Sequence, residues 1–280
     1  MSTRASRLMG AAVLLIALTL LLGCVVSAQA ATSANVFTYT QPSNGNVTIT
    51  GFADKTNYPT TIEIPQTSPD GYKVTGIGEN AFNGCDKLAS VTIPGSVESI
   101  GANAFAKCSL LRSLTLSEGL KSIKGTVNYT NGAFHDCAKL TSVVIPSTVT
   151  SIGNCAFYNC KLLSSVTFLP SADYQMSIGT SAFYGTSLAG ALSIPAKVKS
   201  IEAGAFAGTP ISSLTIEGGA YLKTISSGAF KDCESLATVT IPGNVENINE
   251  SAFANCALLR SLTLSEGLQY IGGKIGRAHV

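Results

Sequence analysis

The chain has 280 residues, a formal net charge of +2, and only 12% charged residues. This small excess of basic charge excludes the obvious footprint of a nucleic-acid-binding protein. The 45% share of hydrophobic residues also excludes an intrinsically disordered chain, which would be poor in apolar residues and rich in charge. We therefore expect a folded protein without a nucleic-acid partner.

Residues 1–30 have the three parts of a secretory signal peptide. Arg4 and Arg7 give a positive start, residues 11–26 are almost entirely apolar, and Ala28-Gln29-Ala30 offers the small residues that signal peptidase reads. No second apolar run follows, so we expect no transmembrane span in the mature chain.

A second processing site lies inside the apolar run. Leu21-Leu22-Gly23-Cys24 resembles a bacterial lipobox, in which Cys24 would carry the lipid. The Ala-x-Ala site fits its own pattern better, so lipidation of Cys24 is the alternative reading. Either route predicts a secreted or cell-surface protein, with a lipid or wall anchor left open.

Residues 31–73 precede the regular part of the chain. Val47–Thr50 and Thr61–Pro65 alternate like short strands but lack the motif that recurs further on. We interpret this segment as an N-terminal cap, since a stacked array needs its open end covered. An independent domain is the less favoured alternative, because about forty residues are few for a separate core.

The dipeptide Ala-Phe then recurs eight times at spacings of 23 to 29 residues. A 23-residue unit cannot bury its apolar side chains alone, so neighbouring units must cover them. The pattern predicts a solenoid over residues 74–273. The phenylalanines are Phe82, Phe105, Phe134, Phe157, Phe183, Phe206, Phe230 and Phe253.

Each unit also holds an apolar-x-apolar triplet, such as Val91-Thr92-Ile93, which predicts a short strand with its middle residue outward. Stacking these strands predicts one parallel sheet along the array. The Ile-Gly and Ala-Phe segments would form the return path, as turns with a short helical piece.

The full pattern, I-x-x-x-A-F-x-x-C-x-x-L-x-x-V-x-I-P, resembles the leucine-rich repeats of BspA-like surface proteins. The resemblance covers most of the mature chain. It implies a leucine-rich-repeat solenoid that mediates adhesion or recognition of an extracellular protein or glycan, without a cofactor. Such arrays serve many partners, so the resemblance does not name the ligand.

Residues 274–280 do not continue the repeat, although residues 260–268 copy residues 112–120 without a change. We interpret this tail as non-native, since codons for Ile275–Val280 could spell part of a sequencing-library adapter. The array would then be truncated in this sequence.

Six cysteines occupy one repeat position, where two units have Thr186 and Thr209 instead. We favour a ladder of buried thiols over disulfide bonds between adjacent units, because stacked inward side chains rarely offer disulfide geometry. One thiol in each unit would not converge on a metal ion. The six are Cys85, Cys108, Cys137, Cys160, Cys233 and Cys256.

Hydroxyl side chains occupy the outward position of nearly every triplet, with Val144 as the exception. This column could be a solvated surface repeated by duplication, or a shallow polar face for a glycan or protein. Its members are Thr92, Thr115, Thr167, Ser193, Thr215, Thr240 and Thr263.

Two longer spacings place insertions at residues 124–132 and 169–175. Insertions in repeat arrays map to surface loops, often on the binding side, although neutral drift is an equal alternative. Tyrosine suits contact at low entropic cost. The candidate contact residues are Tyr129, Asn131, Asp173 and Tyr174.

Catalytic motifs are missing from the sequence. His135 adjoins Asp136, but at a variable position that we interpret as solvated, and no serine-hydrolase, phosphate-loop or zinc-protease motif is present. We predict a non-enzymatic recognition protein. The alternatives are a targeting module of a longer surface enzyme and a structural spacer of the cell envelope.

Overall fold

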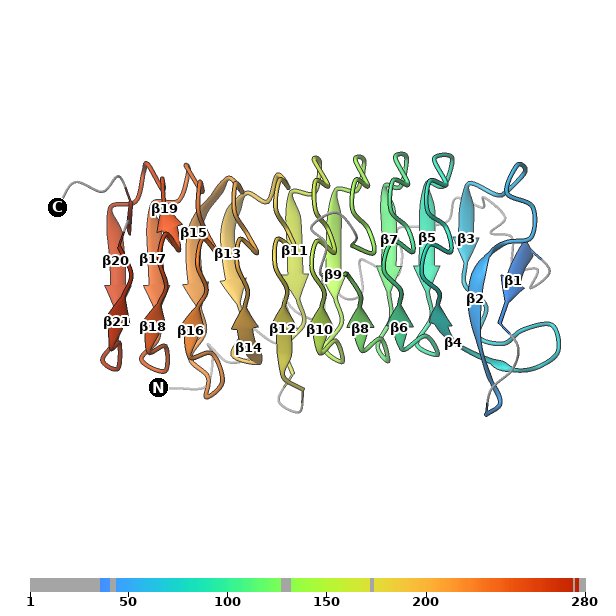
Figure 1. Cartoon of the computed structure of the whole chain (residues 1–280), viewed down its shortest axis with the longest axis horizontal. Helices are drawn as coiled ribbons and strands as arrows, with labels where there is room; N and C mark the ends of the chain where they lie inside the picture. The colour runs from blue at the N-terminus through green and yellow to red at the C-terminus, as the bar shows by residue number, and fades with distance from the viewer. Residues whose placement is uncertain (1–35, 41–43, 127–131, 172–173, 274, 277–280) are drawn as a thin grey trace, which may run out of the picture. The chain divides into compact units, whose positions relative to one another are not determined.

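The computed structural model describes residues 36–40, 44–126, 132–171, 174–273 and 275–276. From β1 onward the chain winds into stacked coils, and strands of successive coils lie side by side (Figure 1). The predicted leucine-rich-repeat solenoid is therefore confirmed. The predicted signal peptide and Cys24 lie outside the described residues.

One sheet of eleven strands runs through all the coils. Its strands pair in parallel, except that β1 is antiparallel to β2. The Ile residue that precedes each Ala-Phe lies in this sheet. The sequence analysis had assigned these Ile residues to the return path. The strands are β1 (Phe37–Tyr39), β2 (Asn46–Phe52), β4 (Lys73–Ile77), β6 (Ser99–Ile100), β8 (Ser122–Ile123), β10 (Ser151–Ile152), β12 (Met176–Ile178), β14 (Val198–Ile201), β16 (Thr224–Ile225), β18 (Asn247–Ile248) and β21 (Tyr270–Ile271).

The triplet strands form three shorter parallel sheets, so the prediction of one continuous triplet sheet is wrong. The breaks fall between β7 and β9 and between β11 and β13, where the two insertions lengthen the coil. The sheets are β3 (Thr61–Glu63), β5 (Ser90–Ile93) and β7 (Ser113–Leu116); β9 (Ser142–Ile145) and β11 (Ser165–Phe168); and β13 (Gly190–Ile194), β15 (Ile211–Ile216), β17 (Thr238–Ile241) and β20 (Ser261–Leu264).

The return path contains turns, and no described residue lies in an α-helix, which corrects the predicted helical piece. In most coils the residues two before and two after the Phe adopt positive φ, as at Asn103 (56°) and Lys107 (59°). The Phe amide between such positions bonds to the next coil, as in Phe105 N to Ala133 O at 2.8 Å. Because residues with positive φ recur around each Phe, the backbone N–H groups of this segment point along the stack and bond to the next coil. The segment therefore does not form a helix.

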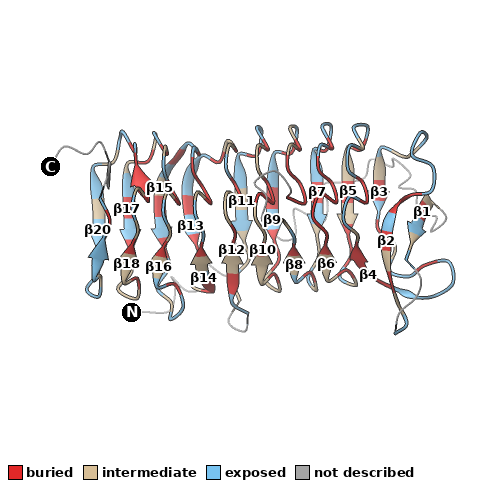
Figure 2. Ribbon diagram, in the orientation of Figure 1, coloured by how far each residue is buried: buried red, intermediate tan, exposed pale blue. Residues whose placement is uncertain are grey.

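Buried residues recur from coil to coil along the described part of the array (Figure 2). The eight Ala-Phe phenylalanines are among them, and each is 0% exposed. Neighbouring rings are nearly parallel, with centroids 5.0–5.4 Å apart. One ring in each coil therefore packs against a ring above and a ring below.

The predicted ladder of buried thiols is present at five of the six repeat positions, whose cysteines are 0% exposed, while Cys85 is half-buried. The seven described cysteines are free. Five of the repeat thiols donate to the Phe carbonyl of the preceding coil, as in Cys137 Sγ to Phe105 O at 3.1 Å. Thr186 and Thr209 instead bond to the Phe carbonyl of their own coil at 2.8 Å. In these two coils the next core residue, Leu188 or Ile211, follows the Phe by five positions instead of the six found in the cysteine coils.

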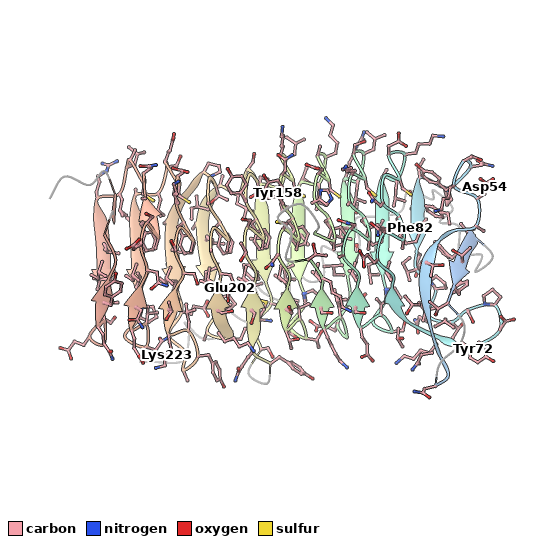
Figure 3. All side chains as sticks on the ribbon, viewed as in Figure 1. Asp54, Tyr72, Phe82, Tyr158, Glu202 and Lys223 are labelled. Carbon is pink, nitrogen blue, oxygen red and sulfur yellow. The ribbon has the colours of Figure 1, made fainter. Side chains whose placement is uncertain are left out.

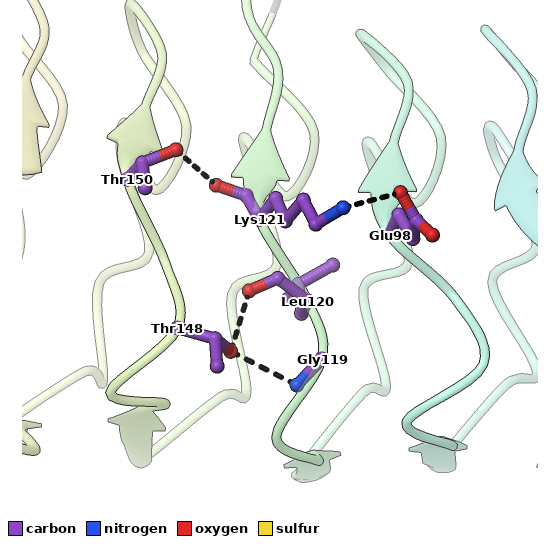
Figure 4. Close-up of polar contacts among 6 residues, drawn as sticks. All are labelled: Glu98, Gly119, Leu120, Lys121, Thr148 and Thr150. Atoms are coloured by element: carbon purple, nitrogen blue, oxygen red, sulfur yellow. Dashed lines mark hydrogen bonds and ion pairs between the residues drawn. The ribbon is translucent and has the colours of Figure 1, made fainter. Parts of the chain in front are cut away.

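Polar side chains join the coils at the edge opposite the Ala-Phe turns (Figure 4). Thr148 Oγ1 accepts from Gly119 N and donates to Leu120 O, both at 2.9 Å. Lys121 Nζ lies 2.8 Å from Glu98 Oε2. The two Thr148 hydrogen bonds satisfy backbone groups of the neighbouring turn, whereas the ion pair joins two side chains.

Lys197 is buried at this edge with only 3% exposure. Its Nζ donates to Ser147 O at 3.0 Å and to Pro146 O at 3.5 Å, across the coil whose turn is replaced by the 169–175 insertion. Burial lowers the pKa of Lys197, while the charge of Glu118 opposes this shift. Lys197 thus connects two coils across the interruption.

Two predicted boundaries remain predictions. The described residues of the predicted cap contribute β1 and β2 to one end of the eleven-stranded sheet and β3 to one end of the first triplet sheet, where a cap would lie. Within the tail that we interpret as non-native, β22 (Ile275–Gly276) pairs in parallel with β19 (Phe253–Ala254).

Candidate functional site

The outward triplet residues lie on the surface as predicted. Thr92 is half-buried, and the other hydroxyl residues and Val144 are exposed. Strand pairing places Thr215 between Ser193 and Thr240 in one ladder. The face therefore presents hydroxyl groups at the spacing of neighbouring strands, about 4.8 Å.

This hydroxyl face is divided into three runs by the breaks in the triplet sheets. The longest run crosses β13, β15, β17 and β20, and its outward residues are Ser193, Thr215, Thr240 and Thr263. The other runs pair Thr92 with Thr115 and Val144 with Thr167. Ser193 Oγ donates to Glu217 Oε1 at 3.0 Å, which adds a carboxylate to the edge of the longest run.

The two insertions leave their coils at different places. The first follows β8, and Gly125 and Gly132 form an isolated antiparallel bridge at its base. A Cβ at either glycine would overlap backbone of the next coil, so only glycine fits there. The second lies between β11 and β12. The structure does not bring the bases of the two insertions together into one site.

The contact residues of these insertions are only partly within the described chain. Tyr174 is described, and it is 44% exposed. Tyr129, Asn131 and Asp173 lie outside the described residues.

A further tyrosine pair, which the sequence analysis missed, lies at the Ala-Phe edge (Figure 3). Tyr158 and Tyr184 stack with ring centroids 5.2 Å apart. Both residues directly follow the Phe of adjacent repeats, so aligning the repeats by Phe would have revealed the pair.

His135 lies in the preceding coil at the same repeat position, and it is only 6% exposed. This burial corrects our interpretation of the site as solvated. Its Nδ1 lies 3.1 Å from Asp136 Oδ2, and the other Asp136 oxygen accepts a hydrogen bond from Asn159. The histidine and its carboxylate are therefore part of the contacts between coils.

A cavity of about 260 Å³ lies between the loop after β2 and the first Ala-Phe turn. Its walls include Lys55, Tyr58, Asn83, Asp86 and Lys87. The sequence analysis did not identify it, because its two walls are separated by about thirty residues and only one of them belongs to a repeat.

The described residues hold neither a membrane-spanning helix nor a metal-binding cluster. No helix among them could span a membrane. No group of three His, Cys, Asp or Glu side chains in this part of the chain could hold a metal ion.

A family model of the BspA-type leucine-rich repeat region matches residues 47–130, 127–190 and 176–275. The match agrees with the solenoid of stacked coils. The chain belongs to the BspA-type leucine-rich-repeat family. No curated protein matches the chain.

Solved structures of bacterial repeat proteins are similar. A leucine-rich repeat protein from Bacteroides ovatus is 26% identical over 84% of this chain, with a TM-score of 0.60. The chain spans 54% of that protein's length. The leucine-rich repeat protein of T. pallidum is 26% identical over 82% of this chain and 90% of its own, with a TM-score of 0.58. The pneumococcal vaccine antigen PcpA, at 18% identity and a TM-score of 0.56, shares the fold.

Proposed function

We propose that this protein is a secreted or cell-surface recognition module that binds an extracellular protein or glycan without catalysing a reaction. The observation that carries the proposal is the longest run of the hydroxyl face, where four neighbouring strands present Ser193, Thr215, Thr240 and Thr263 to solvent. The family membership supports the same role.

The geometry of this face suits a broad, shallow contact. Its backbone is held by strand pairing, so the hydroxyl groups are arranged before a ligand arrives and little ordering entropy is lost on binding. Each hydroxyl can both donate and accept a hydrogen bond, which matches a glycan or a polar protein surface. The exposed Tyr174 adds an aromatic contact on a loop.

The test begins with a binding screen of the full chain against extracellular-matrix proteins and glycans. The double variant Thr215→Lys and Thr240→Lys places two bulky charges on the longest run, and we expect it to weaken binding at least tenfold. Ala203→Lys introduces one lysine at an exposed position outside the triplet strands, and we expect unchanged binding.

Replacement of Tyr129 and Tyr174 with Ala tests the insertions separately. We expect weaker binding with an unchanged melting temperature, since Tyr174 is exposed. The proposal is contradicted if no ligand is found, or if a ligand binds the strand and loop variants as tightly as the native chain.

A further inference from the structure

The cavity next to β2 is bounded by two different structures. One wall is the loop at residues 53–58, and the other is the first Ala-Phe turn, residues 80–87. Asp54 Oδ1 accepts hydrogen bonds from Thr56 N at 2.8 Å, Thr56 Oγ1 at 2.7 Å and Asn57 N at 3.2 Å. These bonds fix the loop, whose end is marked by Asp54 in Figure 3. The cavity walls are therefore ordered without a ligand.

Tyr58 joins the two walls. Its ring stacks on Phe52 with centroids 4.8 Å apart, and its hydroxyl donates to Asp86 Oδ1 at 3.0 Å. The same hydroxyl accepts from Lys87 N at 3.3 Å. Gly84 opens the other side, since a Cβ built there would meet no atom within 4 Å.

The cavity has an excess of positive charge. Lys55 and Lys87 line it together with one carboxylate, Asp86, one oxygen of which is already engaged by Tyr58. Within the described part of the chain, neither lysine forms an ion pair. The Lys87 ammonium lies 5.9 Å from the centre of the Tyr58 ring.

The pKa of the Cys85 thiol is affected by the charges of Asp86 and Lys55. Burial and, to a lesser extent, the charge of Asp86 raise its pKa to about 11, and the charge of Lys55 opposes this shift. The Lys55 charge is therefore felt inside the cavity. Cys85 is also less buried than the other repeat cysteines, which are 0% exposed, because the cavity lies on its side of the coil.

The remaining polar groups are suited to hydroxyls. Asn80 and Asn83 carry carboxamides that both donate and accept, and the free oxygen of Asp86 accepts. A volume of about 260 Å³ is below the roughly 300–1,000 Å³ of pockets for drug-sized ligands, so it suits a single six-membered ring.

We propose that this cavity binds one carboxylated pyranose, such as a hexuronic acid, with its carboxylate at Lys55 and Lys87 and its hydroxyls at Asn80, Asn83 and Asp86. This proposal rests on the proposed recognition function and assigns it an acidic sugar class. It concerns a site separate from the hydroxyl face.

The direct test is titration calorimetry of the full chain with methyl glucuronide. Methyl glucoside, which has the same ring without the carboxylate, is the matched probe. We expect the glucuronide to bind at least tenfold more tightly than the glucoside, because charge-assisted hydrogen bonds form only with the carboxylate. Lys55→Gln and Lys87→Gln should each weaken glucuronide binding by about tenfold.

Lys107→Gln is the control, since Lys107 is an exposed lysine on the next turn and does not line the cavity. We expect it to bind the glucuronide like the native chain. Equal affinity for both sugars, absence of binding, or glucuronide binding that is unchanged in both Lys55→Gln and Lys87→Gln would overturn the proposal. Sodium acetate tests for a simple anion site, and acetate binding as tight as the glucuronide would also overturn it.

Failure here is distinguishable from failure of the recognition function. The sugar titration measures binding in the cavity alone. The variants of Thr215 and Thr240 measure binding of a ligand to the hydroxyl face. A chain that binds a matrix ligand but no glucuronide would retain the recognition function and lose this proposal.

Discussion

At the scale of single residues, each coil depends on one Phe and one hydrogen-bonding side chain near it. The Phe ring fills the interior, and the thiol or hydroxyl donates to a Phe carbonyl that also accepts from a backbone amide, as Phe105 O does from Cys108 N. The side-chain hydrogen bond therefore adds to a backbone bond at the same carbonyl and, for the thiols, joins one coil to the next.

Phe157→Ala should lower the free energy of unfolding by about 3–5 kcal/mol, because its ring contacts Phe134 and Phe183 on both sides at 5.3 Å. Leu162→Ala is the control, since Leu162 is 47% exposed, and its effect should stay within about 0.5 kcal/mol. Denaturant unfolding followed by circular dichroism measures both. Equal effects of the two substitutions would contradict the buried stack.

Cys85 should be the first repeat cysteine that a small alkylating reagent labels in the folded chain. The thiolate is the reactive form, so the labelling rate should rise as the pH increases toward the Cys85 pKa of about 11. Mass spectrometry of labelled peptides measures the rate at each cysteine. Labelling of Cys137 as fast as Cys85 would show that the thiols are not buried as described.

At the scale of elements, the sequence predicted which residues face the interior better than it predicted how the backbone is arranged. The triplet strands and the buried Phe positions follow from periodicity, and both are confirmed. Strands such as β6 and β8 have only two residues, too few for alternation to distinguish a strand from a turn. The eleven-stranded sheet was therefore missed.

The candidate sites show the same limit. The outward position of Thr215 follows from its place within one strand, so the sequence could predict it. Lys197 and Tyr58 contact groups that lie about fifty and thirty residues away. Such contacts depend on how coils stack, which one repeat does not reveal, although Lys197 does replace the Thr148 and Asn244 of equivalent Pro-x-x-Val turns.

Glu118 should make the stability of the fold depend on pH, because its carboxylate bonds to the turn of the next coil. Burial raises the pKa of its carboxyl group, but hydrogen bonds from Ser147 and Thr148 outweigh burial and lower it below 4.5. A lowered folded-state pKa stabilises the fold above the unfolded-state pKa, and this contribution is lost as the pH falls through the folded-state value.

Glu118→Gln should therefore destabilise the chain at pH 7, by less than about 1 kcal/mol because the site is exposed. The difference from the native chain should shrink as the pH is lowered below 4. Glu266→Gln, at the equivalent position of the coil that contains β20, is the control and should have little effect at either pH. Unfolding curves at both pH values decide, and a pH-independent Glu118→Gln effect would contradict this role.

At the scale of the whole array, the coils depend on their neighbours. Backbone hydrogen bonds run from the Phe amide of one coil to the Ala carbonyl of the next, and the eleven-stranded sheet follows the same direction. Stability in such arrays comes from each repeat and its interfaces with adjacent repeats. Both recognition surfaces proposed above therefore rely on this continuous stack.

Hydrogen–deuterium exchange of the full chain tests that continuity most directly. The amides of Phe105, Phe157 and Phe230 each bond to an Ala carbonyl of the following coil at 2.8 Å, so we expect all three to exchange slowly. The exposed amides at residues 220–221 should exchange fast. Exchange of the three Phe amides as fast as that loop would contradict the stacked coils on which the account rests.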